Sequence, residues 1–332
     1  METLIDIVLL GFLVLTALAV AKMHDLFAVV MLSGIYSLLS ASLFLDLDAV
    51  DVAFTEASVG AGISTLLMLA SLKLVGRFEK RTRYRPMLAL GVVLATGTLL
   101  IYGTLDMPHF GSAEAPVHQH VAPRYLNDSI KEVGVANVVT SVLASYRGYD
   151  TLGETLVVFT AGIGVISLLR VSRRTKEEEK QKTPADMQQQ IILRVVVKWL
   201  LPLILIFALY VQFHGDYGPG GGFQAGVIFA AGIILYTMLF GLSNASRVFQ
   251  PEHLERIAAL GVLLYAGVGI GCMVLGGNFL DYNGLGHDPV HGQHLGILLV
   301  ELGVGLTVAS VMITIFFKFT WRTVKHKYVQ KR

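Results

Sequence analysis

The hydrophobic residues of this chain are gathered into long stretches rather than into short segments of alternating polarity. Nine stretches reach the length of a membrane-spanning helix, which needs about 20 predominantly apolar residues. They cover roughly residues 3–21, 26–45, 50–75, 87–104, 151–170, 191–213, 222–242, 255–276 and 294–317. The pattern therefore predicts an all-α polytopic membrane protein with about nine transmembrane helices.

The composition supports a membrane protein and excludes several other classes. Hydrophobic residues make up 54% of the chain and charged residues 15%, and the mean hydropathy is +0.64, which is outside the range of soluble domains. The single cysteine, Cys272, excludes an internal disulfide and a Cys-ligated iron–sulfur cluster. We therefore expect no cofactor. The net charge of +2 comes from basic clusters beside apolar stretches, so nucleic-acid binding is not supported.

The distribution of Lys and Arg predicts the orientation of the spans. Basic clusters at 77–85 and 173–182 belong on the cytoplasmic side by the positive-inside rule. The basic tail at 322–332 agrees, because an even number of spans separates it from the second cluster. The N-terminus is then outside and the C-terminus cytoplasmic. The first apolar run has no positive n-region, so we interpret it as a retained span rather than a signal peptide.

One long polar run, 172–190, interrupts the chain and is typical of a cytoplasmic linker between two membrane modules. It separates the predicted domains 1–104 and 105–171 from the domain 191–332. Within the second domain, the outer segment 125–148 is amphipathic. We expect it to form an interfacial or partly inserted helix rather than a tenth span.

Four carboxylates fall within or at the edge of predicted spans, namely Asp51, Glu56, Glu154 and Glu301. An ionisable group at membrane depth costs about 3 kcal/mol or more and is by default a candidate functional residue. Asp51 and Glu154 lie near predicted boundaries, where a headgroup-level or capping role is equally open. Basic residues lie only near the cytoplasmic ends of the spans. Ionic partners of the carboxylates must therefore come from elsewhere.

A glycine-rich segment, HGDYGPGGGFQAG at 214–226, separates two spans. No Gly-Lys-Ser/Thr follows it and no strand precedes it, which argues against a nucleotide-binding loop. Such a bend at membrane depth must be shielded by protein or line a water-filled cavity. Nearby, His287, His291 and His294 have a spacing compatible with zinc, but Pro289 and Gly292 argue against one continuous helix there. We therefore predict no metal site.

Three motifs carry a resemblance to known families. AVDVAFTEASVGAGIST (49–65) resembles the signature of MbhD-type domains, and SYRGYDTLGETLVVFTAGIGV (145–165) resembles MbhE-type domains. GPGGGFQAGVIFA (218–230), with VELGVGLTV (300–308), resembles the MnhB/MrpB subunit. These families are membrane subunits of Mrp-type multisubunit antiporters and of related membrane-bound hydrogenases, which are both kin to the membrane arm of respiratory complex I.

The resemblance implies a subunit of a Na⁺ (or K⁺)/H⁺ antiporter in the bacterial inner membrane, with antiporter subunits of the A, C, D, E, F and G types as partners. It implies a role in cation or proton passage for Asp51, Glu56 and Glu154, and less directly for Glu301. It also marks a structural element at Gly218, Pro219, Gly220, Gly221, Gly222 and Phe223. The alternatives are the membrane arm of a hydrogenase or other redox-driven pump, and a structural spacer. The order of the domains departs from antiporters in which the first two belong to the large A-type subunit.

Overall fold

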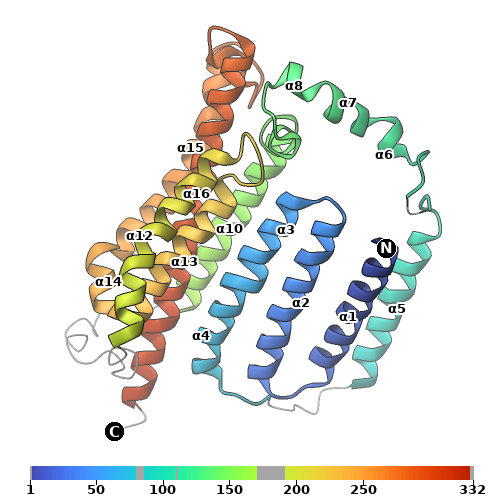
Figure 1. Ribbon diagram of the computed structural model, residues 1–332. Helices are drawn as coiled ribbons and strands as arrows, with labels where there is room; N and C mark the ends of the chain where they lie inside the picture. The colour runs from blue at the N-terminus through green and yellow to red at the C-terminus, as the bar shows by residue number, and fades with distance from the viewer. Residues whose placement is uncertain (1, 80–85, 110, 170–190, 330–332) are drawn as a thin grey trace.

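A computed structural model of the chain describes residues 2–79, 86–109, 111–169 and 191–329, which are mostly helical (Figure 1). Within this part of the chain, nine helical segments are long and apolar enough to cross a membrane. Their axes run roughly parallel or antiparallel to one another (Figure 1). The predicted all-α polytopic architecture is therefore confirmed for the described residues. The predicted linker at 172–190 lies outside them.

The N-terminal half supplies five of the spans. They are α1 (Glu2–Lys22), α2 (Leu26–Asp46), the composite helix α3 (Val50–Glu56), η1 (Ala57–Ser64) and α4 (Thr65–Val75), then α5 (Pro86–Thr104) and α10 (Gly148–Leu168). Helix α2 packs against α1 on one side and against α3, η1 and α4 on the other. Neither α1 nor α5 buries any of its most apolar window in this chain (0% each). These two helices leave large apolar surfaces for lipid or for other chains.

The C-terminal half forms a tighter bundle. Its elements are α12 (Ile191–His214), α13 (Gly222–Phe240), α14 (Leu242–Val248), α15 (Pro251–Val274), η5 (Tyr282–Leu285) and α16 (Pro289–Val329). Helix α16 packs against α13 and α15 within the bundle, and against α10 and α4 from the N-terminal half. In the most apolar windows of α16 and α13, 61% and 56% of the residues are buried. Helix α16 is therefore the central element that joins the two halves.

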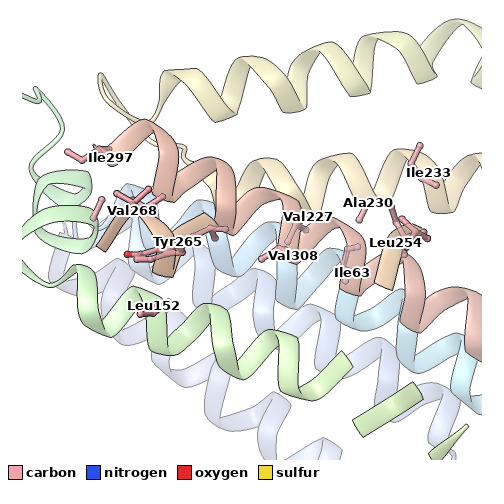
Figure 2. Close-up of a cluster of buried hydrophobic side chains, with 14 of the residues drawn as sticks. Ile63, Leu152, Val227, Ala230, Ile233, Leu254, Tyr265, Val268, Ile297 and Val308 are labelled. Atoms are coloured by element: carbon pink, nitrogen blue, oxygen red, sulfur yellow. The ribbon is translucent and has the colours of Figure 1, made fainter. Parts of the chain in front are cut away.

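The buried hydrophobic side chains show how the halves are joined (Figure 2). Ile63 from η1 and Leu152 from α10 belong to the same cluster as Val227 of α13 and Val308 of α16. The Tyr265 hydroxyl of α15 also donates a hydrogen bond to the Gly148 carbonyl at the start of α10 (2.7 Å). The two modules thus share one apolar core, although a long polar run separates them in the sequence.

The third span is one continuous helix with a π-helical centre, η1, between α3 and α4. A π segment has wider turns than an α-helix and frequently occurs at functional sites. Here it begins directly after Glu56, in the small-residue sequence ASVGAGIS. The Ser58 hydroxyl donates a hydrogen bond to the Phe54 carbonyl (2.7 Å) at the transition.

The outer segment predicted as one amphipathic helix over 125–148 is instead a series of short helices. They are α7 (Val121–Asn127), α8 (Ser129–Glu132), α9 (Val138–Thr140) and the π-helical η2 (Ser141–Tyr146), and another short helix, α6 (Pro116–Gln119), precedes them. Gly134, at φ +81°, breaks the path between α8 and α9, and the Asn137 side chain caps α9. The series forms an arc at one end of the helices (Figure 1). In the described residues it does not supply a tenth span.

Helix α16 begins earlier than the sequence suggested. Pro289 and Gly292 were expected to interrupt a helix there, but α16 starts at Pro289 and runs through Gly292. Proline is well tolerated in the first turn because its missing N–H would have no partner there. Gly292 is required by packing, since a Cβ would lie 2.3 Å from the Tyr282 carbonyl oxygen. His291 and His294 are therefore helical, whereas His287 precedes the helix.

Candidate functional site

The glycine loop, residues 215–221, connects α12 to α13 at the same end of the helices as the α6–α8 arc (Figure 1). It folds back on the end of α12, because the Gly221 amide donates to the Val211 carbonyl (3.0 Å) and the Gly218 amide donates to the His214 carbonyl (3.0 Å). Gly221 has φ +103°, in the left-handed region that favours glycine. The local sequence thus allows a tight turn that side chains would block.

The Glu301 side chain lies directly against this loop. A Cβ on Gly221 would meet Glu301 Oε1 at 2.9 Å, and a Cβ on Gly215 would meet Oε2 at 3.2 Å. A Cβ on Gly222 would lie only 2.0 Å from the backbone oxygen of Glu301. The glycines therefore let the loop and the start of α13 approach α16 closely enough to cover this carboxylate. The helices α12, α13 and α16 meet here, and we call this place the glycine-loop junction.

Asp51 reaches the same loop from the other half of the chain. Its Oδ1 accepts hydrogen bonds from the Gly220 amide (3.4 Å) and from Asn137 Nδ2 (3.3 Å). Asn137, which is 8% exposed, also donates from Nδ2 to the Gly218 carbonyl (2.9 Å). Since Asp51 begins α3 and Asn137 caps α9, three separate segments meet at the loop.

A histidine–aspartate pair also contacts the loop. His294 Nδ1 lies 3.4 Å from Asp216 Oδ2, and its Nε2 lies 3.2 Å from the Gly134 carbonyl oxygen. The backbone N–H of Asn137 donates a hydrogen bond to the backbone oxygen of Asp216 (3.0 Å). The pair is partly exposed, at 37% for His294 and 22% for Asp216. His294 is therefore tied into the site as a hydrogen-bonding residue.

Glu56 occupies a separate polar position between α2 and the π segment η1. A Cβ on Gly60 would meet Glu56 Oε1 at 2.6 Å and the Ser37 hydroxyl at 2.5 Å, so both oxygens lie against this glycine. In the described part of the chain, no hydrogen bond or ion pair joins Glu56 to the glycine loop. Asp51 and Glu56 are five residues apart on one continuous helix, a step of about 140° around its axis, which agrees with their different neighbours.

Glu154 lies on an exposed part of α10. Both Glu154 and the preceding Gly153 are exposed. A Cβ built on Gly153 would have no neighbour within 4 Å. The nearest outer turn carries an ion pair between Arg147 and Asp150 (2.5 Å). No hydrogen bond or ion pair involves Glu154 within the described residues.

The structure thus brings Asp51 and Glu301 to one loop and leaves Glu56 and Glu154 apart. The glycine element forms this loop and the start of α13, where Phe223 packs on the core and Pro219 is partly buried. The sequence analysis missed Asn137, Asp216 and Gln212 as members of the junction. Their signal was weak, because isolated polar residues at the ends of spans are common. The described residues contain no group of three His, Cys, Asp or Glu that could hold a metal ion.

Comparison with known families finds three successive matches along the chain. Residues 11–77 match the family of the D-type MBH subunit, and residues 90–188 match that of the E-type MBH subunit. Residues 192–314 match the "Domain related to MnhB subunit of Na+/H+ antiporter". Glu301 and the glycine loop fall in the third match, and Asp51 falls in the first. The contact between Asp51 and the glycine loop therefore connects two regions of the chain that match different families.

Two curated proteins illustrate how the domains are combined elsewhere. The probable K⁺/H⁺ antiporter A/B-type subunit of Rhizobium meliloti (strain 1021) is 27% identical over 343 residues, which include 92% of this chain and 33% of that protein. The B-type Na⁺/H⁺ antiporter subunit of Bacillus subtilis (strain 168) is 30% identical over 132 residues, which include 37% of this chain and 92% of that protein. The chain thus spans about a third of the first relative and nearly all of the second.

Two solved structures share the arrangement of the helices. The Mrp complex from Dietzia sp. DQ12-45-1b contains a chain that matches 94% of this one with a TM-score of 0.73 and 27% identity, although only 34% of that chain is covered. The membrane-bound sulfane sulfur reductase, an archaeal respiratory membrane complex, contains a chain that matches 70% of this one with a TM-score of 0.53 and 26% identity. Nearly the whole of this chain therefore corresponds to about a third of one longer chain of the Mrp complex.

Proposed function

Because the chain belongs to the MnhB family of antiporter subunits, we propose that it works in a multisubunit Na⁺/H⁺ antiporter of the bacterial inner membrane. It is a multi-pass transporter subunit whose homologues are components of such complexes. We propose that it supplies the MbhD-like domain 1–104, the MbhE-like domain 105–171 and the MnhB-like domain 191–332 as one polypeptide. The remaining antiporter subunits, of the A, C, D, E, F and G types, would complete the antiporter complex.

One observation carries the assignment of an ion path to this chain. Asp51 from the MbhD-like domain accepts a hydrogen bond from the glycine loop, and the carboxylate of Glu301 from the MnhB-like domain lies against the same loop. Non-helical backbone at membrane depth is tolerated only inside protein or beside a water-filled cavity, and carboxylates at this depth mark ion pathways. We propose that Asp51, Glu56, Glu154 and Glu301 together line a path for a monovalent cation or for protons.

Glu154 would act at the surface of the chain. An exposed carboxylate facing lipid is costly, by about 3 kcal/mol on insertion scales, whereas a partner subunit or a water file can satisfy it. The exposed face of α10 therefore supports a path that continues between this chain and a neighbour.

Replacement of Glu56, Glu154 and Glu301 singly by Gln in the intact complex tests this function. We expect Na⁺-dependent proton exchange in everted vesicles to fall by about tenfold or more, since the amide cannot carry the charge that the transition requires. Asp150→Asn is the matched control, because Asp150 lies one turn from Glu154 but is paired with Arg147. Normal exchange by all three assembled Gln variants would instead identify a structural spacer.

A redox-driven pump is the second candidate, and the similarity to a chain of the sulfane sulfur reductase supports it. The two candidates differ in the soluble partners that they require. Purification of the tagged chain from its native membrane should recover antiporter subunits without an iron–sulfur or nickel protein. Recovery of such a redox module would favour the second candidate.

A further inference from the structure

Gln212 is a buried amide whose hydrogen-bonding capacity is incompletely used. It lies on α12 three residues before the glycine loop and is 6% exposed, and its Nε2 has no hydrogen-bond partner in the described chain. Buried polar groups without partners are uncommon in native structures and require an explanation. Packing alone does not explain Gln212, because a leucine of similar volume would avoid the cost of an unpaired buried donor.

The end of the Gln212 side chain lies at the glycine-loop junction. A Cβ on Gly305 would meet Gln212 Oε1 at 2.7 Å and the Gly222 carbonyl oxygen at 3.2 Å. Gly305 lies one turn of α16 after Glu301. Gly222 packs against both turns, because a Cβ built on Gly222 would lie close to the backbone of both residues. The Gln212 side chain of α12 therefore contacts α16 one turn after Glu301.

The junction carries negative charge without a matching cation. Glu301 accepts no hydrogen bond from the described residues, and the carboxylates of Asp216 and Asp51 are close enough to act on it electrostatically. The one basic side chain paired with any of the three, over the ranges that the structure describes, is His294 on Asp216. Unscreened carboxylates in a low-dielectric environment repel each other strongly and attract a cation.

From these two independent observations we propose that Glu301 and Gln212 form a binding site for one dehydrated monovalent cation beneath the glycine loop. This inference rests on the proposed antiporter function and specifies where the cation binds in this chain. One carboxylate and amide or backbone carbonyl oxygens are suitable ligands for Na⁺ or K⁺. The absence of a cluster of three ionisable ligands in the described residues agrees with a monovalent rather than a transition-metal ion.

The glutamine gives the site two states. A primary amide carries one acceptor oxygen and one donor NH₂ group, which exchange places on rotation about the last side-chain bond. With a cation present, the oxygen faces it alongside the Glu301 carboxylate. A further rotation of the side chain, away from the unpaired position that its NH₂ group has in this structure, would let that group donate to the carboxylate when no cation is bound. Gln212 would therefore be a specificity-determining ligand, and leucine could perform neither role.

Chemical labelling of Glu301 in the purified complex tests the site without relying on transport. Dicyclohexylcarbodiimide reacts with protonated carboxyl groups in apolar surroundings, and mass spectrometry of the α16 peptide measures the product. We expect NaCl or KCl to slow the labelling of Glu301 by about fivefold or more relative to choline chloride, because a bound cation excludes the proton. In Gln212→Leu, half-protection should need about tenfold more cation, corresponding to the loss of one ligand.

Gln293→Leu is the matched control. Gln293 lies on the same helix as Glu301 and is also 6% exposed, but it bonds to Ser145 and Asn283 at both ends (2.7 and 2.9 Å). Its replacement should leave cation protection of Glu301 unchanged. Should Gln212→Leu fail to assemble, Gln212→Asn retains the amide on a shorter arm and should show an intermediate requirement for cation.

Several outcomes would overturn the site. They are labelling that neither Na⁺ nor K⁺ slows, a Glu301 that does not react in choline chloride, and full protection in Gln212→Leu. Measurement of exchange in the same preparation separates these outcomes from a failure of the proposed function. Normal antiport without cation protection of Glu301 would refute the site alone, whereas cation protection without any antiport would refute the function alone.

Discussion

Two regions of the molecule present a glutamate at membrane depth, and they do so in opposite ways. At the glycine-loop junction, Glu301 is covered by backbone so closely that a methyl group on Gly222 would overlap its carbonyl oxygen, at 2.0 Å. On the face of α10, Glu154 is exposed, and a methyl group on Gly153 would touch nothing within 4 Å. Hydropathy hardly separates the two spans, at 2.1 and 1.7.

The contrast indicates which surroundings this chain completes by itself. The junction is built from α12, α13 and α16 with help from Asp51 and Asn137, so its geometry is internal. The α10 face is open, because Glu154 is exposed and no described residue makes a hydrogen bond or ion pair with this carboxylate, which needs polar neighbours at membrane depth. A component of a larger assembly is expected to contain both kinds of site, and each predicts different responses to mutation.

Gly222→Ala should have the largest effect on this contrast. The added methyl group must push α13 away from α16, and such overpacking costs about 1–3 kcal/mol or more. We expect a lower melting temperature of the purified complex together with loss of Na⁺-dependent proton exchange. Gly153→Ala is the matched control. It should change the free energy of unfolding by no more than about 0.5 kcal/mol, and it should leave proton exchange unchanged. Equal effects of the two substitutions would show that the contrast between the regions is wrong.

Asn137→Ala should have an intermediate effect, because it removes the hydrogen bonds that join Asp51 to the Gly218 carbonyl. Leaving a buried partner unsatisfied costs about 1–3 kcal/mol, and less is expected here because Asp51 and Gly218 are only partly buried. Backbone hydrogen exchange of residues 215–221 should accelerate while that of α10 stays constant. Asn244→Ala provides the comparison, since Asn244 is exposed and bonds only to Phe240 of the preceding turn (2.8 Å). An unchanged exchange rate in the loop would contradict the role assigned to Asn137.

The smallest effect is expected at the contact between α8 and η2. Tyr146 donates a hydrogen bond to Glu132. Burial, and then this bond, raises the pKa of Tyr146 to about 12. The same hydrogen bond, with help from Arg124, holds the pKa of Glu132 below its usual range. Since the folded pKa of Tyr146 is raised, its stabilisation is complete below the unfolded pKa of about 10 and is lost as the pH rises toward about 12.

The alkaline loss should therefore appear as faster hydrogen exchange in α8 and η2 between about pH 10 and pH 12, after correction for intrinsic exchange. Tyr146→Phe should remove most of this pH dependence. Tyr149→Phe should leave it intact, because Tyr149 is 74% exposed. The glycine-loop junction should not respond, and a parallel change at residues 215–221 would mean that the arc and the junction are one cooperative unit.

Sequence reasoning selects candidate residues where a single span carries its own signal. Glu301 and the glycine-rich bend were both identified as candidates, because a carboxylate and a run of glycines are each unusual in apolar sequence. The proposal that a bend at membrane depth must be shielded agrees with the buried Gly220, Gly221 and Gly222. The start of α16 was placed too late, because proline in a first turn was given too much weight as a helix breaker.

Other features depended on contacts between distant parts of the chain. Asn137 and Asp216 are ordinary polar residues in sequence, and they acquire a role only because α9 and the glycine loop are adjacent in space. Gln212 stands out only after its burial and its unpaired donor are known. Similarly, Asp51 and Glu154 looked equivalent as carboxylates near predicted boundaries, whereas Asp51 accepts hydrogen bonds from Gly220 and Asn137 and Glu154 is exposed.

The sequence by itself determined the membrane class, the number of spans within the described residues and the family, since each follows from hydrophobic length or from a local motif. The tertiary structure decided which carboxylates share a site, which glycines are required and which face is left open. The physical reason is that the cost of exposing apolar residues is additive along the chain. The environment of a charged group instead depends on neighbours up to 169 residues apart, as in the bond between Gly220 and Asp51.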